Sequence, residues 1–161
     1  MRLSYLISLT IVQLFVFSAS SCSRNEEIVP PTNNNTHPPS DNAQTGEKVR
    51  VKVGSKVFTV TLVDTNSAKA FRKMLPLEVN MIELNNNEKY CDLPNSLPTN
   101  SSNPQIIKSG DLMLYGSKTL VLFYKSFSTS YSYTKLGVID DATGLEEALG
   151  KGNVIVKFES E

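Results

Sequence analysis

The chain has 161 residues, and its 16 basic and 16 acidic side chains give a formal net charge of zero at pH 7. This balance excludes the basic footprint with which nucleic-acid-binding proteins neutralise phosphates, so no nucleic-acid partner is expected. Two cysteines are too few for a disulfide framework, and a folded domain must therefore depend on its own apolar core.

The first 21 residues have the pattern of a secretory signal. Arg2 gives a positive start, residues 3–17 form an uncharged and mostly apolar run, and residues 18–21 are small. A cationic end, an apolar stretch of roughly 7–15 residues and a small-residue cleavage zone are typical of a cleaved signal rather than a membrane span. We therefore predict that residues 1–21 are a signal peptide.

Cys22 follows the small residues directly, and this arrangement resembles the lipobox of bacterial lipoproteins. The resemblance implies that Cys22 becomes the N-terminus and is diacylated, and two acyl chains anchor a protein stably to a membrane. Ala19 stands where such signals commonly carry leucine, so an ordinary cleaved signal is the alternative. Removal of Arg2 leaves 15 basic against 16 acidic residues, a mature charge of about −1.

The acidic pair Glu26-Glu27 lies just behind Cys22 and resembles the surface-export signal of Bacteroidetes lipoproteins. The resemblance implies a cell-envelope protein, an outer-membrane lipoprotein, and it favours exposure on the cell surface over the periplasmic side.

Residues 22–47 are predicted to be the lipidated cysteine followed by a disordered tether. This stretch is rich in asparagine and proline and has few apolar side chains. Such a segment cannot bury enough surface to offset its ordering entropy. His37 is the only histidine of the chain and lies in this tether, so we predict no metal or catalytic role for it.

Residues 48–161 are predicted to form one domain, made mainly of β-strands. Val49, Val51 and Val53 alternate with basic residues, which is the period of a half-buried strand. Gly54-Ser55 is typical of a tight hairpin turn. Further strands are predicted over residues 56–63, 77–84, 90–93, 111–115, 119–125, 135–139 and 153–158, with an irregular loop over residues 94–104.

Two short helices interrupt the strands. The first places Ser67, Phe71, Met74 and Leu75 on one face, with Thr65 or Asn66 as N-cap and an end at proline 76.

The second helix is predicted from a capping box. Thr143 is expected as its N-cap, Glu146 as its third residue and Gly150 as its end. Asp140 and Asp141 precede it, where negative charge favours a helix N-terminus.

Several stretches of this domain resemble the bacterial cyclophilin-like domain. They are residues 75–77 (LPL), 90–94 (YCDLP), 110–116 (GDLMLYG), 123–125 (FYK), 130–134 (SYSYT) and 137–140 (GVID). The resemblance covers nearly all of residues 48–158. It implies a cyclophilin-like closed β-barrel of about eight strands with two short helices.

The resemblance carries over no catalytic residue. True cyclophilins use an arginine beside an apolar pocket that holds the substrate proline, with a tryptophan and a histidine nearby. This chain has no tryptophan, and Arg50 and Arg72 lie in no stretch that matches the isomerase motif. We therefore predict no catalytic, cofactor-binding or metal-binding residue, and we expect Cys91 to be a buried small hydrophobe.

The segment from Tyr124 to Tyr133 has the composition of a binding surface, and its candidate ligand-binding residues are Tyr124, Phe127, Tyr131 and Tyr133. Phe127, Tyr131 and Tyr133 share one face of an extended chain, with hydroxyl side chains opposite. Rigid rings with a polar tip give contact area at a low entropy cost, which suits a peptide or glycan ligand. The alternative is that these rings only cover the mouth of the barrel.

The sequence therefore predicts a membrane-anchored lipoprotein that presents a barrel, most simply a non-enzymatic peptide- or glycan-binding module. A divergent peptidyl-prolyl isomerase acting on exported proteins is the alternative. An accessory subunit of a larger envelope assembly is the third reading.

Overall fold

The computed structural model describes residues 46–161. The predicted signal peptide, Cys22 and the tether up to residue 45 lie outside the described residues. Within residues 46–161, no helix is long and apolar enough to cross a membrane.

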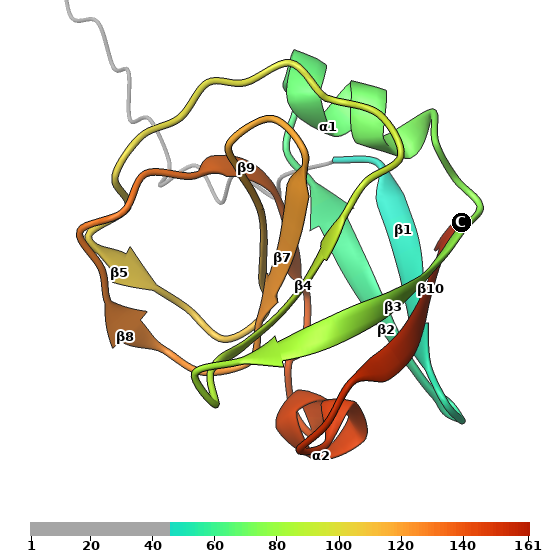
Figure 1. Cartoon of the computed structure of the whole chain (residues 1–161). Helices are drawn as coiled ribbons and strands as arrows, with labels where there is room; N and C mark the ends of the chain where they lie inside the picture. The colour runs from blue at the N-terminus through green and yellow to red at the C-terminus, as the bar shows by residue number, and fades with distance from the viewer. Residues whose placement is uncertain (1–45) are drawn as a thin grey trace, which may run out of the picture. The chain divides into compact units, whose positions relative to one another are not determined.

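Eight antiparallel strands close into a barrel (Figure 1). In chain order they are β1 (Lys48–Val53), β2 (Lys56–Leu62), β3 (Leu77–Leu84), β4 (Glu88–Asp92), β6 (Asp111–Tyr115), β7 (Thr119–Phe123), β9 (Thr134–Ile139) and β10 (Val154–Ser160). Around the barrel the order is β1-β10-β3-β4-β7-β6-β9-β2. Closure pairs every strand on both sides and so removes exposed sheet edges. The predicted fold class is confirmed, and each predicted strand corresponds to one barrel strand.

A second, two-stranded sheet lies beside the barrel (Figure 1). It pairs β5 (Ile106–Ile107) with β8 (Phe127–Ser128). The sequence did not predict it, because strands of two residues are too short to show an alternating pattern.

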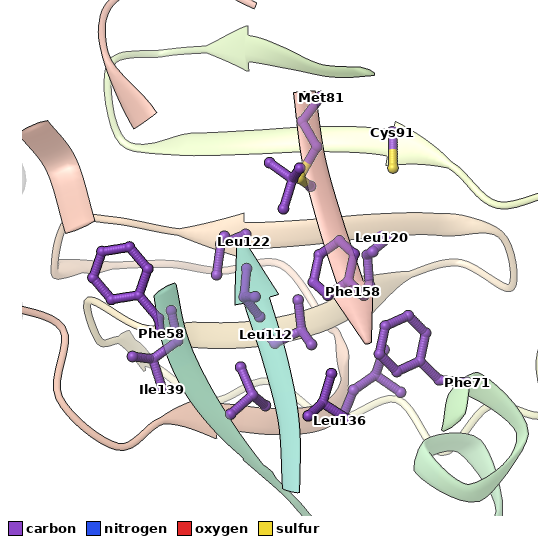
Figure 2. Packing of buried hydrophobic residues seen from close by; sticks show 14 of the residues in the cluster. Phe58, Phe71, Met81, Cys91, Leu112, Leu120, Leu122, Leu136, Ile139 and Phe158 are labelled. Carbon is purple, nitrogen blue, oxygen red and sulfur yellow. The ribbon is translucent and has the colours of Figure 1, made fainter. Parts of the chain in front are cut away.

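The two helices cover opposite ends of the barrel (Figure 1). In α1 (Asn66–Arg72) the predicted N-cap is confirmed: the Thr65 hydroxyl accepts a hydrogen bond from the backbone N–H of Ala68 at 3.2 Å. The Phe71 side chain of α1 reaches into the barrel and meets Phe158 of β10 edge to face, with ring centroids 5.6 Å apart (Figure 2). Burying one such ring contributes roughly 1.5–3 kcal/mol.

The predicted capping box of α2 (Leu145–Leu149) is wrong. The N-cap is Gly144, with φ of 76° and no side-chain capping bond. The Thr143 N–H instead donates to the Asp141 carboxylate at 2.9 Å, so an Asx turn uses the threonine that the pattern assigned to the cap. The end at Gly150 is confirmed.

The inward-facing side chains of all eight strands, together with Phe71 of α1, fill the barrel. Figure 2 shows several of them. Cys91 of β4 is among them, is 6% exposed and is a free cysteine, which confirms its predicted role in the core. Burial and the nearby Asp92 charge raise the pKa of its thiol to about 11.

A buried lysine closes the α2 end of the barrel. Lys89 is fully buried and forms an ion pair with Glu83. Its ammonium also donates to the carbonyls of Gly150 at 2.8 Å and Gly152 at 2.6 Å, beyond the end of α2. Tyr124 completes the network by donating its hydroxyl to Glu83 at 2.8 Å. All three donors of the ammonium are therefore used, as a buried charge requires.

Candidate functional site

The strands β6 and β7 are covered by side chains on their outer face as well as inside the barrel. Val121 and Phe123 of β7 point outward and pack with Met113, Ile107 and Tyr133 in a second apolar cluster. This double burial explains why β7 reads as an almost continuous apolar run, since a strand covered on both faces loses its polar alternation.

A groove of about 540 Å³ opens beside this outer cluster. We call it the aromatic groove. Its lining comes from the end of β3, the turn after it, β4, β6, β7 and the segment from Phe127 to Tyr133. The lining residues are Leu84, Asn85, Asn87, Glu88, Tyr90, Tyr115, Thr119, Val121, Phe127, Ser128, Thr129, Ser130, Tyr131 and Tyr133.

The rings of the groove pack against one another in fixed geometry. Tyr115 meets Tyr131 edge to face at 6.2 Å between centroids and meets Tyr133 at 5.7 Å. Behind them, Phe123 meets Tyr133 at 5.5 Å and Phe127 at 5.7 Å. Contacts of this kind hold the rings in place, so a ligand would meet a preformed surface.

The rings also form a gradient of depth. Tyr131 is 61% exposed and Tyr115 is 49% exposed, whereas Tyr133 is 8% exposed and Val121 is 3% exposed. The first pair therefore forms the rim of the groove and the second pair its floor.

The loop of residues 94–104 fixes the segment that carries these rings. Ser102 and Tyr133 exchange two backbone hydrogen bonds of 3.0 Å. The backbone N–H of Thr129 donates to the carbonyl of Gln105 at 2.9 Å. The loop and the aromatic segment, which are far apart in the sequence, thus support each other at the groove.

Glu88 is the acidic group of the groove and was not predicted from the sequence. It lies at the start of β4 and is only 9% exposed. Burial, and to a lesser degree the charge of Glu83, raise the pKa of its carboxyl. Its charge in turn adds to the effect of burial in raising the pKa of the Tyr133 hydroxyl. The predicted strand began at Tyr90 and so left out Glu88, whereas β4 begins at Glu88 and its alternation with Lys89 places Glu88 on the outer face.

Residues 51–159 match the cyclophilin-like family. The chain belongs to the cyclophilin-like family. No curated protein matches it. Among solved structures, it resembles the solution structure of the hypothetical protein AF2241 from Archaeoglobus fulgidus, with a TM-score of 0.58 and 16% identity over 72% of this chain and 95% of the other. At that identity the likeness concerns the fold.

In this cyclophilin-like domain, three of the four predicted binding residues lie together. Phe127, Tyr131 and Tyr133 all line the aromatic groove, although β8 ends at Ser128 and they do not form one extended strand. Tyr124 lies elsewhere: its ring packs in the barrel core and is 6% exposed. Burial and its hydrogen bond to Glu83 raise the pKa of Tyr124.

The two arginines of the domain lie away from the groove. Arg50 pairs with Glu159 at 3.6 Å on the outside of β1, and Arg72 pairs with Glu47 at 2.9 Å at the end of α1. Asp140 pairs with Lys48 at 2.7 Å. Among the described residues, no group of three or more His, Cys, Asp or Glu side chains is arranged to hold a metal ion.

Proposed function

We propose that this protein is a non-enzymatic peptide- or glycan-binding module, and that the aromatic groove is its binding surface. One observation carries the proposal: a preformed groove of about 540 Å³ lined by five aromatic rings, two of them about half exposed or more at the rim. Such a volume lies in the range of small-ligand sites. Tyrosine at a rim offers both a flat apolar face and a hydroxyl, the combination that peptide and sugar ligands use.

The same proposal places the module in the cell envelope. The signal pattern of residues 1–21 and the cysteine at 22 support a lipoprotein anchored by Cys22, in the outer membrane and facing outward or into the periplasm. Growth with a radiolabelled fatty acid tests the anchor: the label should be lost in Cys22→Ser. Incorporation that persists in this variant would overturn the anchor.

Binding is tested by screening peptide and glycan arrays with the purified full chain in detergent micelles. A ligand so found should bind Tyr131→Ala at least about tenfold more weakly, because the largest exposed contact of the rim is gone. Ile155→Ala is the matched control, since Ile155 is 56% exposed on β10 outside the groove. If both variants lose affinity equally, or if neither loses any, the aromatic groove is not the binding surface.

A divergent peptidyl-prolyl isomerase is the second candidate. Membership of the cyclophilin-like family and the apolar floor at Val121 favour it, because an apolar surface can favour the twisted amide over the planar one. The groove, however, is lined by none of the described arginines, the group on which cyclophilin catalysis depends. Exchange NMR with an alanyl-proline peptide distinguishes the two candidate functions. Cross-peaks between the cis and trans peptide that appear only when the protein is present would mean that the protein is an isomerase and not a non-enzymatic binding module.

A further inference from the structure

The lining of the aromatic groove is acidic. Of the described residues that line it, Glu88 is the one charged side chain, and none is lysine, arginine or histidine. The other dominant groups are the rings of Tyr90, Tyr115, Phe127, Tyr131 and Tyr133. The faces of aromatic rings carry negative potential and attract cations. The carboxylate and the rings therefore favour the same kind of ligand group, a positively charged one.

Glu88 also lacks an internal partner for its charge. Within residues 46–161, its carboxyl forms none of the ion pairs, and only burial and the like charge of Glu83 act on it. The neighbouring Asn87 also lines the groove, and its buried side-chain oxygen has no hydrogen-bond partner among the described residues. A buried acceptor without a partner, such as the Asn87 oxygen, is costly, and a donor supplied by a ligand would offset that cost.

The depth of Glu88 restricts how a positive charge can reach it. Glu88 is 9% exposed, whereas Tyr131 at the rim is 61% exposed. Lysine and arginine carry their charge at the end of a three- or four-carbon stem that packs well on apolar surface. An amino sugar carries its ammonium directly on a bulky polar ring, which cannot enter as a thin stem does.

We propose that the aromatic groove binds a lysine or arginine side chain of a peptide, with the cationic head at Glu88 and the stem along the rings of Tyr131 and Tyr133. This inference rests on the proposed binding function and names its ligand class. The charge-assisted hydrogen bond at Glu88 provides selectivity, and the cation–π contacts with the tyrosines add to it.

The test compares peptides that differ only in one charge. The full chain in detergent micelles is titrated with the heptapeptide Gly-Ser-Gly-Lys-Gly-Ser-Gly, blocked at both ends. A second peptide has norleucine at the central position, which keeps the four-carbon stem of lysine but lacks the ammonium group. A third has arginine. Calorimetry should show the lysine or the arginine peptide binding at least about tenfold more tightly than the norleucine peptide, the factor expected for one charge-assisted contact.

Two variants test whether Glu88 causes the preference for the charged peptides. Glu88→Gln keeps the shape of the side chain and should reduce the difference between the charged and norleucine peptides to the smaller part that the tyrosine rings supply. Glu78→Gln is the matched control, since Glu78 lies on the neighbouring strand β3 and pairs with Lys157 outside the groove; it should keep the preference. A preference that is unchanged in Glu88→Gln, or equal binding of all three peptides, would overturn the inference and leave the binding module standing.

The remaining outcomes separate the inference from the proposed function. Binding of a glucosamine oligomer but of none of the peptides would overturn the peptide ligand while keeping a binding module. Binding of no peptide in this set, together with no hit on the peptide and glycan arrays, would overturn both.

Discussion

Glu88 and Lys89 are neighbours in the sequence, but their side chains lie on opposite faces of β4. Lys89 points into the barrel, where it pairs with Glu83 and two backbone carbonyls. Glu88 points outward into the aromatic groove, where it has no basic partner among the described residues. The alternation of a strand thus separates a charge that stabilises the fold from one that is available to a ligand.

The first prediction concerns Lys89. Lys89→Ala should destabilise the domain by about 3–5 kcal/mol, because it leaves the Glu83 carboxylate and the carbonyls beyond α2 without their donor. Urea unfolding followed by circular dichroism measures the change. Lys157→Ala breaks an exposed pair with Glu78 and should have little effect. Similar losses for both lysines would show that the buried network is not a principal support of the barrel.

The second prediction concerns stability and pH at Glu88. Its pKa in the folded state is raised above the ordinary value of 4.5, so the folded protein holds this proton more tightly than the unfolded chain does. The stability that this gives is fully present below pH 4.5 and is lost as the pH rises through the folded-state pKa. Glu88→Gln should therefore melt at a higher temperature than the natural protein at pH 7, and the gain should vanish below pH 4.5.

Thermal melts over pH 4 to 8 measure this effect. The control is Glu147→Gln on the exposed face of α2, for which no comparable gain at pH 7 is expected. A lower melting temperature for Glu88→Gln at pH 7 would mean that the carboxylate contributes to stability, contrary to its unpaired position.

The third prediction compares two threonines at helix starts. Thr65→Ala removes a real N-cap and should cost about 1 kcal/mol. Thr143→Ala removes no cap, because α2 begins after Gly144, and should stay within about 0.5 kcal/mol. Unfolding curves of the two variants are compared directly. A larger loss for Thr143→Ala would restore the capping box that the sequence pattern suggests.

The fourth prediction concerns the reactivity of Cys91. Its thiol is buried and its pKa is raised to about 11, so almost no thiolate is present at pH 8. In the Cys22→Ser variant, where Cys91 is the only cysteine, a thiol reagent should react only after denaturation. Rapid labelling of the native protein would show that β4 opens readily.

Much of the barrel could be predicted because its strands have a regular pattern. Val49, Val51 and Val53 alternate with polar residues, and this period marks a strand that is buried on one face. Phe127 and Tyr133 were predicted to lie on a binding surface, and the structure places both in the lining of the groove. Tyr124 is an aromatic residue of the same segment, but its ring packs in the barrel core. It differs from the other two because it directly follows β7, which ends at Phe123.

Other features depend on contacts between distant segments. Glu88 becomes a groove residue because the loop around Ser102 fixes the aromatic segment over β4, and no local pattern reports that contact. The prediction that Thr143 is the N-cap of α2 failed for a different reason. A capping box and an Asx turn are two local hydrogen-bonding patterns that compete for this threonine, and the Asx turn prevails.

The pairing of β1 with β10 has a consequence for how the domain is made. Val49 lies opposite Ser160, so the first strand of the barrel needs its last strand as a neighbour. Until the ribosome has released β10, one side of β1 has no partner and the interior is open to water. Contacts between residues so far apart in the chain also form slowly. The barrel can therefore close only after its final strand has been made, and until then β1 presents an unpaired edge on which a second chain could pair.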